Sequence, residues 1–270
     1  MAMLLKSQLP YHSAHRIMNF FNDVGYVLAN YWQLFLRGVL WTLVISLVAT
    51  LIGLLIGLII GIIRTIPPSK NKVVRVIQKI IDFILNAYIE VFRGTPMMVQ
   101  AVVIYWGYAF AAGGQTLPLI PSAIVIVSIN TGAYIAEIVR GGIVGIDKGQ
   151  FEAAYAMGMS HFQTMIHVVL PQVMKSILPA VSNEFVINIK DTSVLNVIGV
   201  TELYFIMSVT VKTTYKNFPV YFIGAVIYFL LTFAVTRIIK LIEKKLHGKK
   251  HYSLYASNAI GDLATSEGGN

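Results

Sequence analysis

A run without charge between Arg37 and Arg64 sets the strongest limit on what this chain can fold into. Residues 38–63 consist mainly of Leu, Ile and Val. A helix needs about 20 apolar residues to cross a bilayer, so the run predicts a membrane-spanning helix. Within it, glycines recur at every fourth position, at Gly53, Gly57 and Gly61. Such a stripe favours close packing against a second helix, although it also occurs in ordinary glycine-rich membrane helices.

The composition extends this interpretation to the whole chain. Hydrophobic residues make up 56% of the 270 residues and charged residues only 12%, about half the charged fraction of soluble domains. The apolar runs are continuous rather than alternating, which argues against a transmembrane β-barrel. The absence of cysteine excludes disulfides, thiolate metal sites and cysteine nucleophiles. The net charge of +9 comes from Lys and Arg beside apolar runs, so it indicates membrane orientation rather than nucleic-acid binding.

Four more apolar segments are candidates for spans, which predicts an all-α integral membrane protein with about five transmembrane helices. They are residues 95–112, residues 121–140, a helix from Pro171 or Ser176 to about Ile189, and residues 217–236. Residues 76–92 carry Asp82 and Glu90, and whether they form a span stays open. Residues 192–216 are mixed in character, and we expect them to be partly re-entrant or external.

The charge distribution predicts the orientation of the chain. Five spans with the C-terminus inside would place 14 of the 21 Lys and Arg residues inside and 6 outside, which favours an external N-terminus and a cytoplasmic C-terminus. We therefore divide the chain into an external or interfacial segment (1–34), a transmembrane domain (35–245) and a cytoplasmic polar tail (246–270).

The chain shows no sign of its own energy source. No G-x4-G-K-[ST] nucleotide motif occurs, so any nucleotide energy would come from another chain. No inverted repeat of the kind found in many secondary transporters is visible. His161 and His167 lack the further ligands that a metal site needs. These observations predict a subunit of a larger assembly, with no catalytic residue and no metal site.

The segment 151–171 carries the most specific motif. It contains Glu152-Ala153-Ala154, Gly158 and Leu170-Pro171. At this spacing it resembles the cytoplasmic motif of ABC importer permeases (EAA, three residues, G, nine residues, I, one residue, LP), with Val168 where the family usually has Ile. The small residues would let a short helix near 150–162 enter a partner's groove, and Glu152 would lie near the positive start of that helix. The alternative is an ordinary interfacial amphipathic helix.

Three further segments resemble the permeases for polar amino acids of the histidine, arginine, glutamine and cystine type. They are Glu90–Pro96, Tyr134–Gly142 and Asn183–Ser193. The resemblance covers about residues 35–245 and implies the five-helix core of a type I importer, with the motif at 152–171 as its coupling helix. It also implies these partners: an ATPase subunit that binds ATP and Mg, an extracytoplasmic amino-acid-binding protein, a second permease subunit that is the same or a related chain, an amino acid substrate and membrane lipid.

The first candidate substrate-binding residues are Gly94 and Thr95. Thr95-Pro96 fits a helix start, with Thr95 as N-cap and Pro96 as the first helical residue. If this start lies inside the membrane, its free N–H groups suit a carboxylate. The alternative, which stays open, is a turn at the membrane interface.

The second group consists of Asn183, Glu184, Asn188 and Asp191. Glu184, Asn188 and Asp191 lie at i, i+4 and i+7, on one face of a helix. A charge at the membrane centre costs roughly 2.5–3.5 kcal/mol, so this face is expected to line a cavity or contact a partner. It could hold the ammonium group of an amino acid. The alternative is that Asp191 lies at the interface and only Glu184 is buried.

The function that we predict is the permease subunit of an ATP-driven importer for polar amino acids in the cytoplasmic membrane. An ATP-independent secondary carrier or channel subunit is the alternative, and an exporter subunit is a third hypothesis. Glu137 and Arg140 are spaced to pair at i, i+3, and we expect a structural role for them.

Overall fold

The computed structural model describes the backbone of residues 2–247 and the side chains of residues 17–245. Within this part all regular secondary structure is helical. Its elements are α1 (Ala2–Ile63), α2 (Lys72–Gly94), α3 (Met97–Ala111), α4 (Leu119–Val144), α5 (Lys148–Ala156), α6 (His161–Thr164), the π-helical turn η1 (Met165–Val169), α7 (Leu170–Asp191), the 3-10 turn η2 (Thr192–Ile198), α8 (Leu203–Thr214) and α9 (Asn217–His247).

The predicted all-α membrane class is confirmed. Four helical segments are long and apolar enough to cross a membrane, namely Ile17–Ile63, Leu119–Val144, His161–Ile198 and Asn217–Lys245. The predicted helix at 95–112 exists as α3, but its 15 residues extend only about 22 Å, less than the roughly 30 Å of a hydrocarbon core. Residues 76–92 belong to α2, a 23-residue helix that begins at its N-cap, Asn71, and that is not among these four segments.

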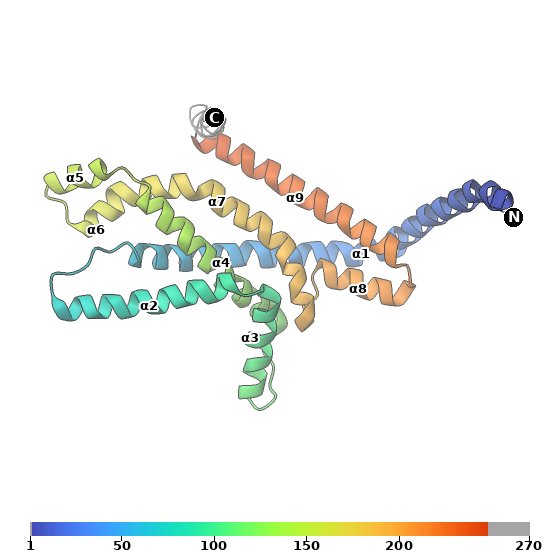
Figure 1. Cartoon of the computed structure of the whole chain (residues 1–270), viewed down its shortest axis with the longest axis horizontal. Helices are drawn as coiled ribbons and strands as arrows, with labels where there is room; N and C mark the ends of the chain where they lie inside the picture. The colour runs from blue at the N-terminus through green and yellow to red at the C-terminus, as the bar shows by residue number, and fades with distance from the viewer. Residues whose placement is uncertain (1, 248–270) are drawn as a thin grey trace.

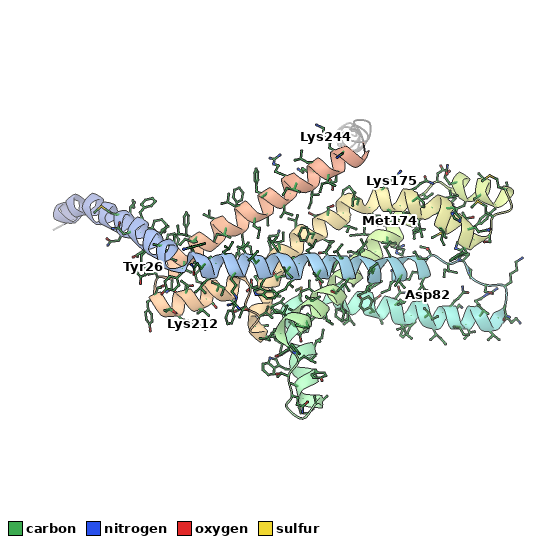
Figure 2. The ribbon with its side chains drawn as sticks, turned by 180° about the vertical axis from the view of Figure 1, so that it is seen from behind. Tyr26, Asp82, Met174, Lys175, Lys212 and Lys244 are labelled. Atoms are coloured by element: carbon green, nitrogen blue, oxygen red, sulfur yellow. The ribbon has the colours of Figure 1, made fainter. Side chains whose placement is uncertain are left out.

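The helices are arranged around α1 and α4. In Figure 1, α1 runs along the longest axis, α2 lies beside it, and α3 projects across that direction. α4 packs most extensively on α1 and also contacts α2, α3 and α7. Seen from behind, Tyr26 on α1 and Lys212 on α8 lie toward one end of the molecule, and Lys175 on α7 lies toward the other (Figure 2).

The glycine stripe of α1 packs directly against α4, as predicted. A Cβ atom added at Gly53 would lie 3.0 Å from Thr131, at Gly57 2.6 Å from Ile135, and at Gly61 2.6 Å from Val139. Carbon atoms normally pack about 3.5–4.0 Å apart. Only glycine therefore allows the two helix backbones to approach this closely.

A buried amide ties three helices together beside this contact. The Asn188 side chain on α7 is 3% exposed, and its nitrogen donates to Thr50 Oγ1 on α1 (2.8 Å) and Thr131 Oγ1 on α4 (3.0 Å). Lipid offers no hydrogen-bond partner to such groups, so these bonds hold the three helices in one register.

The predicted boundary between residues 34 and 35 lies within α1, which is continuous from Ala2 to Ile63. The part of α1 around Val27 packs against α8 and α9, and Val27 is fully buried in one cluster with Leu203 and Val220. Asp23 also forms an ion pair with Lys216. Of the predicted tail 246–270, residues 248–270 lie outside the described part of the chain.

A buried carboxylate organises the junction of α1, α8 and α9. Glu202 is fully buried and caps α8, accepting hydrogen bonds from the backbone N–H groups of Tyr204 (2.8 Å) and Phe205 (2.7 Å). The hydroxyl of Tyr228 on α9 donates to the same carboxylate at 3.1 Å. Burial raises the pKa of Glu202 to about 7, although these three hydrogen bonds favour the ionised form.

Candidate functional site

The break between α2 and α3 is built by the dipeptide Thr95-Pro96. The residue before a proline avoids the helical region, and Thr95 is extended (φ −122°, ψ 148°). The prediction that Thr95 caps the next helix is wrong, because Pro96 occupies the N-cap position of α3. The Thr95 hydroxyl instead donates backward to the carbonyl of Val91 (2.7 Å).

Gln100, which sequence reasoning missed, holds this break in place. It is 7% exposed, and its nitrogen donates to the carbonyls of Phe92 and Thr95, both at 2.9 Å. Its oxygen accepts from Asn130 on α4 (2.9 Å). The carbonyls freed at the end of α2 are therefore bonded within the protein, which membrane proteins require wherever a helix is interrupted. The sequence did offer a signal for this role of Gln100: it is an amide side chain one turn into an apolar helix that follows a Thr-Pro break.

Beside the break, Arg93 lies near the acidic face of α7. The Arg93 guanidinium carbon is 5.4 Å from the centre of the Tyr134 ring on α4, a distance at which a cation is attracted to the aromatic face. Glu184 interacts electrostatically with both Arg93 and Asp191. Asp191 itself interacts electrostatically with the adjacent Lys190. We call Arg93, Glu184 and Asp191 the Arg93 cluster.

The predicted substrate residues divide into two groups. Gly94 and Thr95 are exposed and follow Arg93 directly, Asn183 is exposed beside Glu184, and Glu184 and Asp191 are half-buried. Asn188 is instead bonded in the core between α1, α4 and α7. Glu184 interacts with Asp191 and also with Arg93, which was not among the predicted site residues, whereas Asn188 is separate from them.

A second charged cluster joins α1, α2 and α4. The predicted pair of Glu137 and Arg140 is confirmed, with 2.9 Å between Oε2 and Nη2. Arg64, at the end of α1, also pairs with Glu137 and donates to the Asn86 side chain on α2. The sequence identified only the local pair, because nothing in a linear pattern links Arg64 to a residue 73 positions away.

The motif segment forms α5, a sharp turn and α6. Asp147, not Glu152, supports the start of α5, since its carboxylate accepts from the N–H of Gly149 (2.6 Å); Glu152 lies in the middle of the helix and is exposed. Gly158, in the turn after α5, has φ +80°, a left-handed conformation that favours glycine. Ser160 and Gln163 then form a reciprocal capping box at α6.

The small residues of the motif do not all face outward. Ala154 is 1% exposed, so it packs inside this chain rather than in a partner's groove, whereas Ala153 and Gly158 are exposed. Large apolar side chains cover the outside of the segment instead: Tyr155, Met157 and Phe162 are 46%, 72% and 71% exposed. Leu170 and Pro171 form the first turn of α7, directly after η1.

Comparison with known proteins places the chain among transport permeases. Residues 73–248 match the family described as the inner membrane component of binding-protein-dependent transport systems. The L-cystine transport system permease protein TcyB of Bacillus subtilis is 36% identical over 165 residues, which cover 61% of this chain and 70% of that protein. The glutamine transport system permease protein GlnP of Escherichia coli is 35% identical over 167 residues, which cover 62% and 76%.

Solved structures agree with this assignment. A crystal structure of an amino acid ABC transporter with histidines shares 35% identity and a TM-score of 0.69, covering 82% of this chain and 97% of its own. The MetNI methionine ABC transporter, in an inward-facing conformation, has the same fold with a TM-score of 0.60 at 22% identity. The resemblance that rested on short motifs thus extends over most of the chain. This multi-pass membrane protein belongs to the inner membrane components of binding-protein-dependent transport systems, with the fold of a type I ABC importer permease.

Proposed function

We propose that the chain is the permease subunit of an importer for polar amino acids, with its N-terminus outside and its C-terminus in the cytoplasm. A separate ATPase would bind ATP and Mg, an external binding protein would deliver the substrate, and a second permease would complete the pathway. The names of the relatives, which are glutamine and cystine permeases, support an amino acid substrate.

The observation that carries this proposal is the Arg93 cluster. A free amino acid has a carboxylate and an ammonium group close together. Arg93 would hold the carboxylate, because a guanidinium forms bidentate hydrogen bonds with a planar carboxylate. Glu184 and Asp191 would hold the ammonium group or a cationic side chain. Arg93 comes from α2 and both carboxylates from α7, so substrate recognition would depend on the relative position of these two helices.

The same helix would connect recognition to the ATPase. α7 carries Glu184 and Asp191, and it continues without interruption from η1 and α6. α5 packs against both α6 and η1. A movement imposed on the exposed apolar surface of Tyr155, Met157 and Phe162 would therefore reach the start of α7 directly. Because η1 is a π-helical turn, it is a natural point for such a helix to adjust.

The test is ATP hydrolysis by the reconstituted complex with a panel of amino acids. We expect Glu184→Gln to raise the half-maximal concentration of the stimulating amino acid about tenfold, since a hydrogen bond to a charged group contributes about 1.5–3 kcal/mol. Asp82→Asn, which neutralises a carboxylate in the middle of α2, is the matched control and should leave this concentration unchanged.

Three results would count against the proposal. An unchanged response of Glu184→Gln would remove this residue from the substrate site. Failure of any ATPase to co-purify with the chain would instead favour an ATP-independent carrier. Co-purification with an ATPase that no amino acid stimulates would refute the substrate class while leaving the coupling surface intact.

A further inference from the structure

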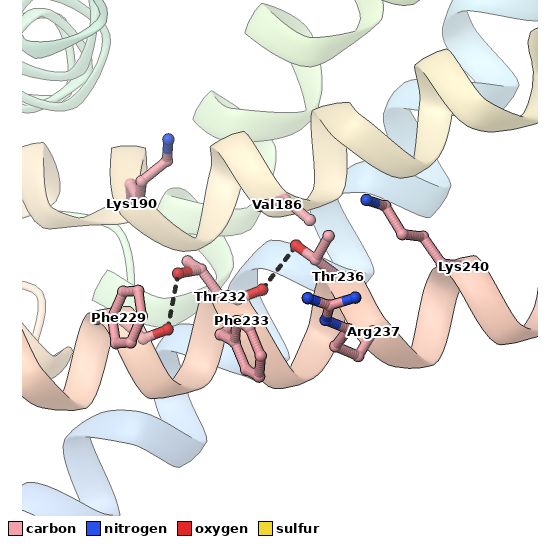
Figure 3. Close-up of a pocket in the computed structure, with 8 residues that line it drawn as sticks. All are labelled: Val186, Lys190, Phe229, Thr232, Phe233, Thr236, Arg237 and Lys240. Atoms are coloured by element: carbon pink, nitrogen blue, oxygen red, sulfur yellow. Dashed lines mark hydrogen bonds between the residues drawn. The ribbon is translucent and has the colours of Figure 1, made fainter.

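A groove with a volume of about 260 Å³ runs between α7 and α9, on the outside of the molecule (Figure 3). It is lined by Val186 and Lys190 of α7 and by Phe229, Thr232, Phe233, Thr236, Arg237 and Lys240 of α9. The α9 residues recur at intervals of three and four, so they form one face of that helix. The groove is open rather than enclosed, so it would hold part of a ligand at the surface and not a whole buried molecule.

The charge of the groove has one sign. Three of its eight lining residues are cations, Lys190, Arg237 and Lys240, and none is a carboxylate. All three are exposed. Glu243 lies one turn beyond Lys240 but is buried and does not line the groove. Arg237 and Lys240 lie toward one end of the groove, whereas Lys190 lies beside Phe229 at the other end, with its ammonium group pointing away from α9 in the view of Figure 3.

The remaining lining combines aromatic surface with occupied hydroxyls. Phe229 and Phe233 are 64% and 47% exposed, and the Arg237 guanidinium carbon lies 4.9 Å from the centre of the Phe233 ring. The Thr232 hydroxyl donates to the carbonyls of Tyr228 (2.8 Å) and Phe229 (3.2 Å), and the Thr236 hydroxyl donates to the carbonyl of Thr232 (2.7 Å); the last two bonds are drawn in Figure 3. The donors left for a ligand are therefore mainly Arg237 and Lys240, which select for negative charge.

The groove is distinct from the Arg93 cluster. Val186 and Lys190 are four residues apart and share one face of α7, whereas Glu184 and Asp191 are seven apart and share another. Successive helix positions are about 100° apart, so Glu184 and Val186 point to nearly opposite sides of α7. A ligand of the groove would not contact Glu184, whereas Lys190 links the groove to the cluster through its electrostatic interaction with Asp191.

Exposed apolar side chains surround the groove. α9 is one of the four candidate spans, and Leu230 and Ile238, which flank the groove on this helix, are 56% and 57% exposed. Its basic residues occupy the second half of the helix, where a span approaches the interface. Basic recesses between transmembrane helices at that depth are typical binding sites for acidic head groups.

We propose that this groove binds the head group of an anionic phospholipid. The phosphate contacts Arg237 and Lys240, Lys190 adds attraction from α7, and an acyl chain lies along Phe229 and Phe233. A zwitterionic head group binds less well, because its ammonium group meets Arg237 and Lys240, and none of the lining residues is a carboxylate. The bound lipid bridges α7, which carries Glu184 and Asp191, to the last helix.

Native mass spectrometry of the full chain in detergent, titrated with phosphatidylglycerol or phosphatidylcholine, tests the proposal. Arg237→Gln combined with Lys240→Gln should weaken phosphatidylglycerol binding at least fivefold and leave phosphatidylcholine binding unchanged. Lys244→Gln combined with Lys245→Gln is the matched control. It removes the same charge from the same helix outside the groove, and it should change binding less than twofold.

Three results would overturn the proposal. Phosphatidylglycerol binding could weaken equally in both double variants, which indicates diffuse attraction, or could stay unchanged in the groove variant. Free amino acids could also displace phosphatidylglycerol, which makes the groove a substrate subsite. Thermal unfolding in phosphatidylcholine checks that the variants are folded. If the groove variant does not fold, Lys190→Gln on the opposite wall should still weaken phosphatidylglycerol binding at least twofold, and an unchanged affinity would reject the site.

Discussion

Replacing Gly57 with alanine would test the close contact between α1 and α4. The new Cβ atom would lie 2.6 Å from Cγ2 and 2.7 Å from Cβ of Ile135, and 2.9 Å from the backbone nitrogen of Ala136. Ile135 is fully buried and a backbone atom cannot rotate away, so the helices must separate by roughly 1 Å to reach normal contact. Overpacking of this kind costs about 1–3 kcal/mol, and the better helix propensity of alanine returns up to about 1 kcal/mol.

We therefore expect Gly57→Ala to lower the free energy of unfolding by about 1–2 kcal/mol, from the balance of these two terms. At about 2–4 °C per kcal/mol, the melting temperature should fall by roughly 2–8 °C. Thermal unfolding of the purified chain in lipid and detergent measures this. The control is Gly25→Ala in the same helix, where an added Cβ meets no atom within 4 Å. If Gly57→Ala melts at or above Gly25→Ala, close packing does not explain the glycine stripe.

Three further predictions follow from other parts of the structure. Burial raises the pKa of Glu202 from 4.5 to about 7, so between these pH values the folded state holds a proton that the unfolded state has released, and stability should fall as pH rises through this window. Glu202→Gln should flatten that fall in melting curves taken from pH 4 to 8. An identical pH dependence in this variant would contradict the assignment. Gly158→Asp places a side chain at φ +80° in the exposed turn after α5. We expect this variant to insert normally into the membrane but to take up no radiolabelled amino acid. Normal uptake would argue against coupling through this turn. Glu137→Gln leaves the Arg64 and Arg140 guanidinium groups without their carboxylate, which should reduce the free energy of unfolding by about 1–3 kcal/mol. If this variant melts at the same temperature as the control Asp82→Asn, the ion pairs contribute nothing to stability.

Local signals predicted several elements well. The uncharged run at 38–63 ends where α1 ends, at Ile63, because proline and charge stop an apolar helix. The expected helix from Pro171 to Ile189 corresponds to α7. Spacing of three residues identified the ion pair of Glu137 and Arg140. Each of these features depends on neighbours within one or two helical turns.

Capping and exposure were predicted less well. Thr95 and Glu152 are both residue types that stabilise helix starts, but Pro96 and Asp147 occupy the N-cap positions. Ala154 is small enough for a partner's groove, yet it is buried within its own chain. A residue type indicates what a position can do, whereas the packing of the chain decides which of those roles it performs.

By itself, the sequence determined that this is a helical membrane protein, where its apolar helices lie, that α1 can pack closely on another helix, and which transporter family its motifs resemble. These properties follow from local composition and spacing, because a bilayer admits few backbone arrangements. Only the tertiary structure decided that α4 is the partner of the glycine stripe, that Gln100 secures the break between α2 and α3, and that Arg93 joins Glu184 and Asp191 while Asn188 holds three helices together. The contacts between different helices join residues as far as 138 positions apart, and their partners are set by how the helices pack in space.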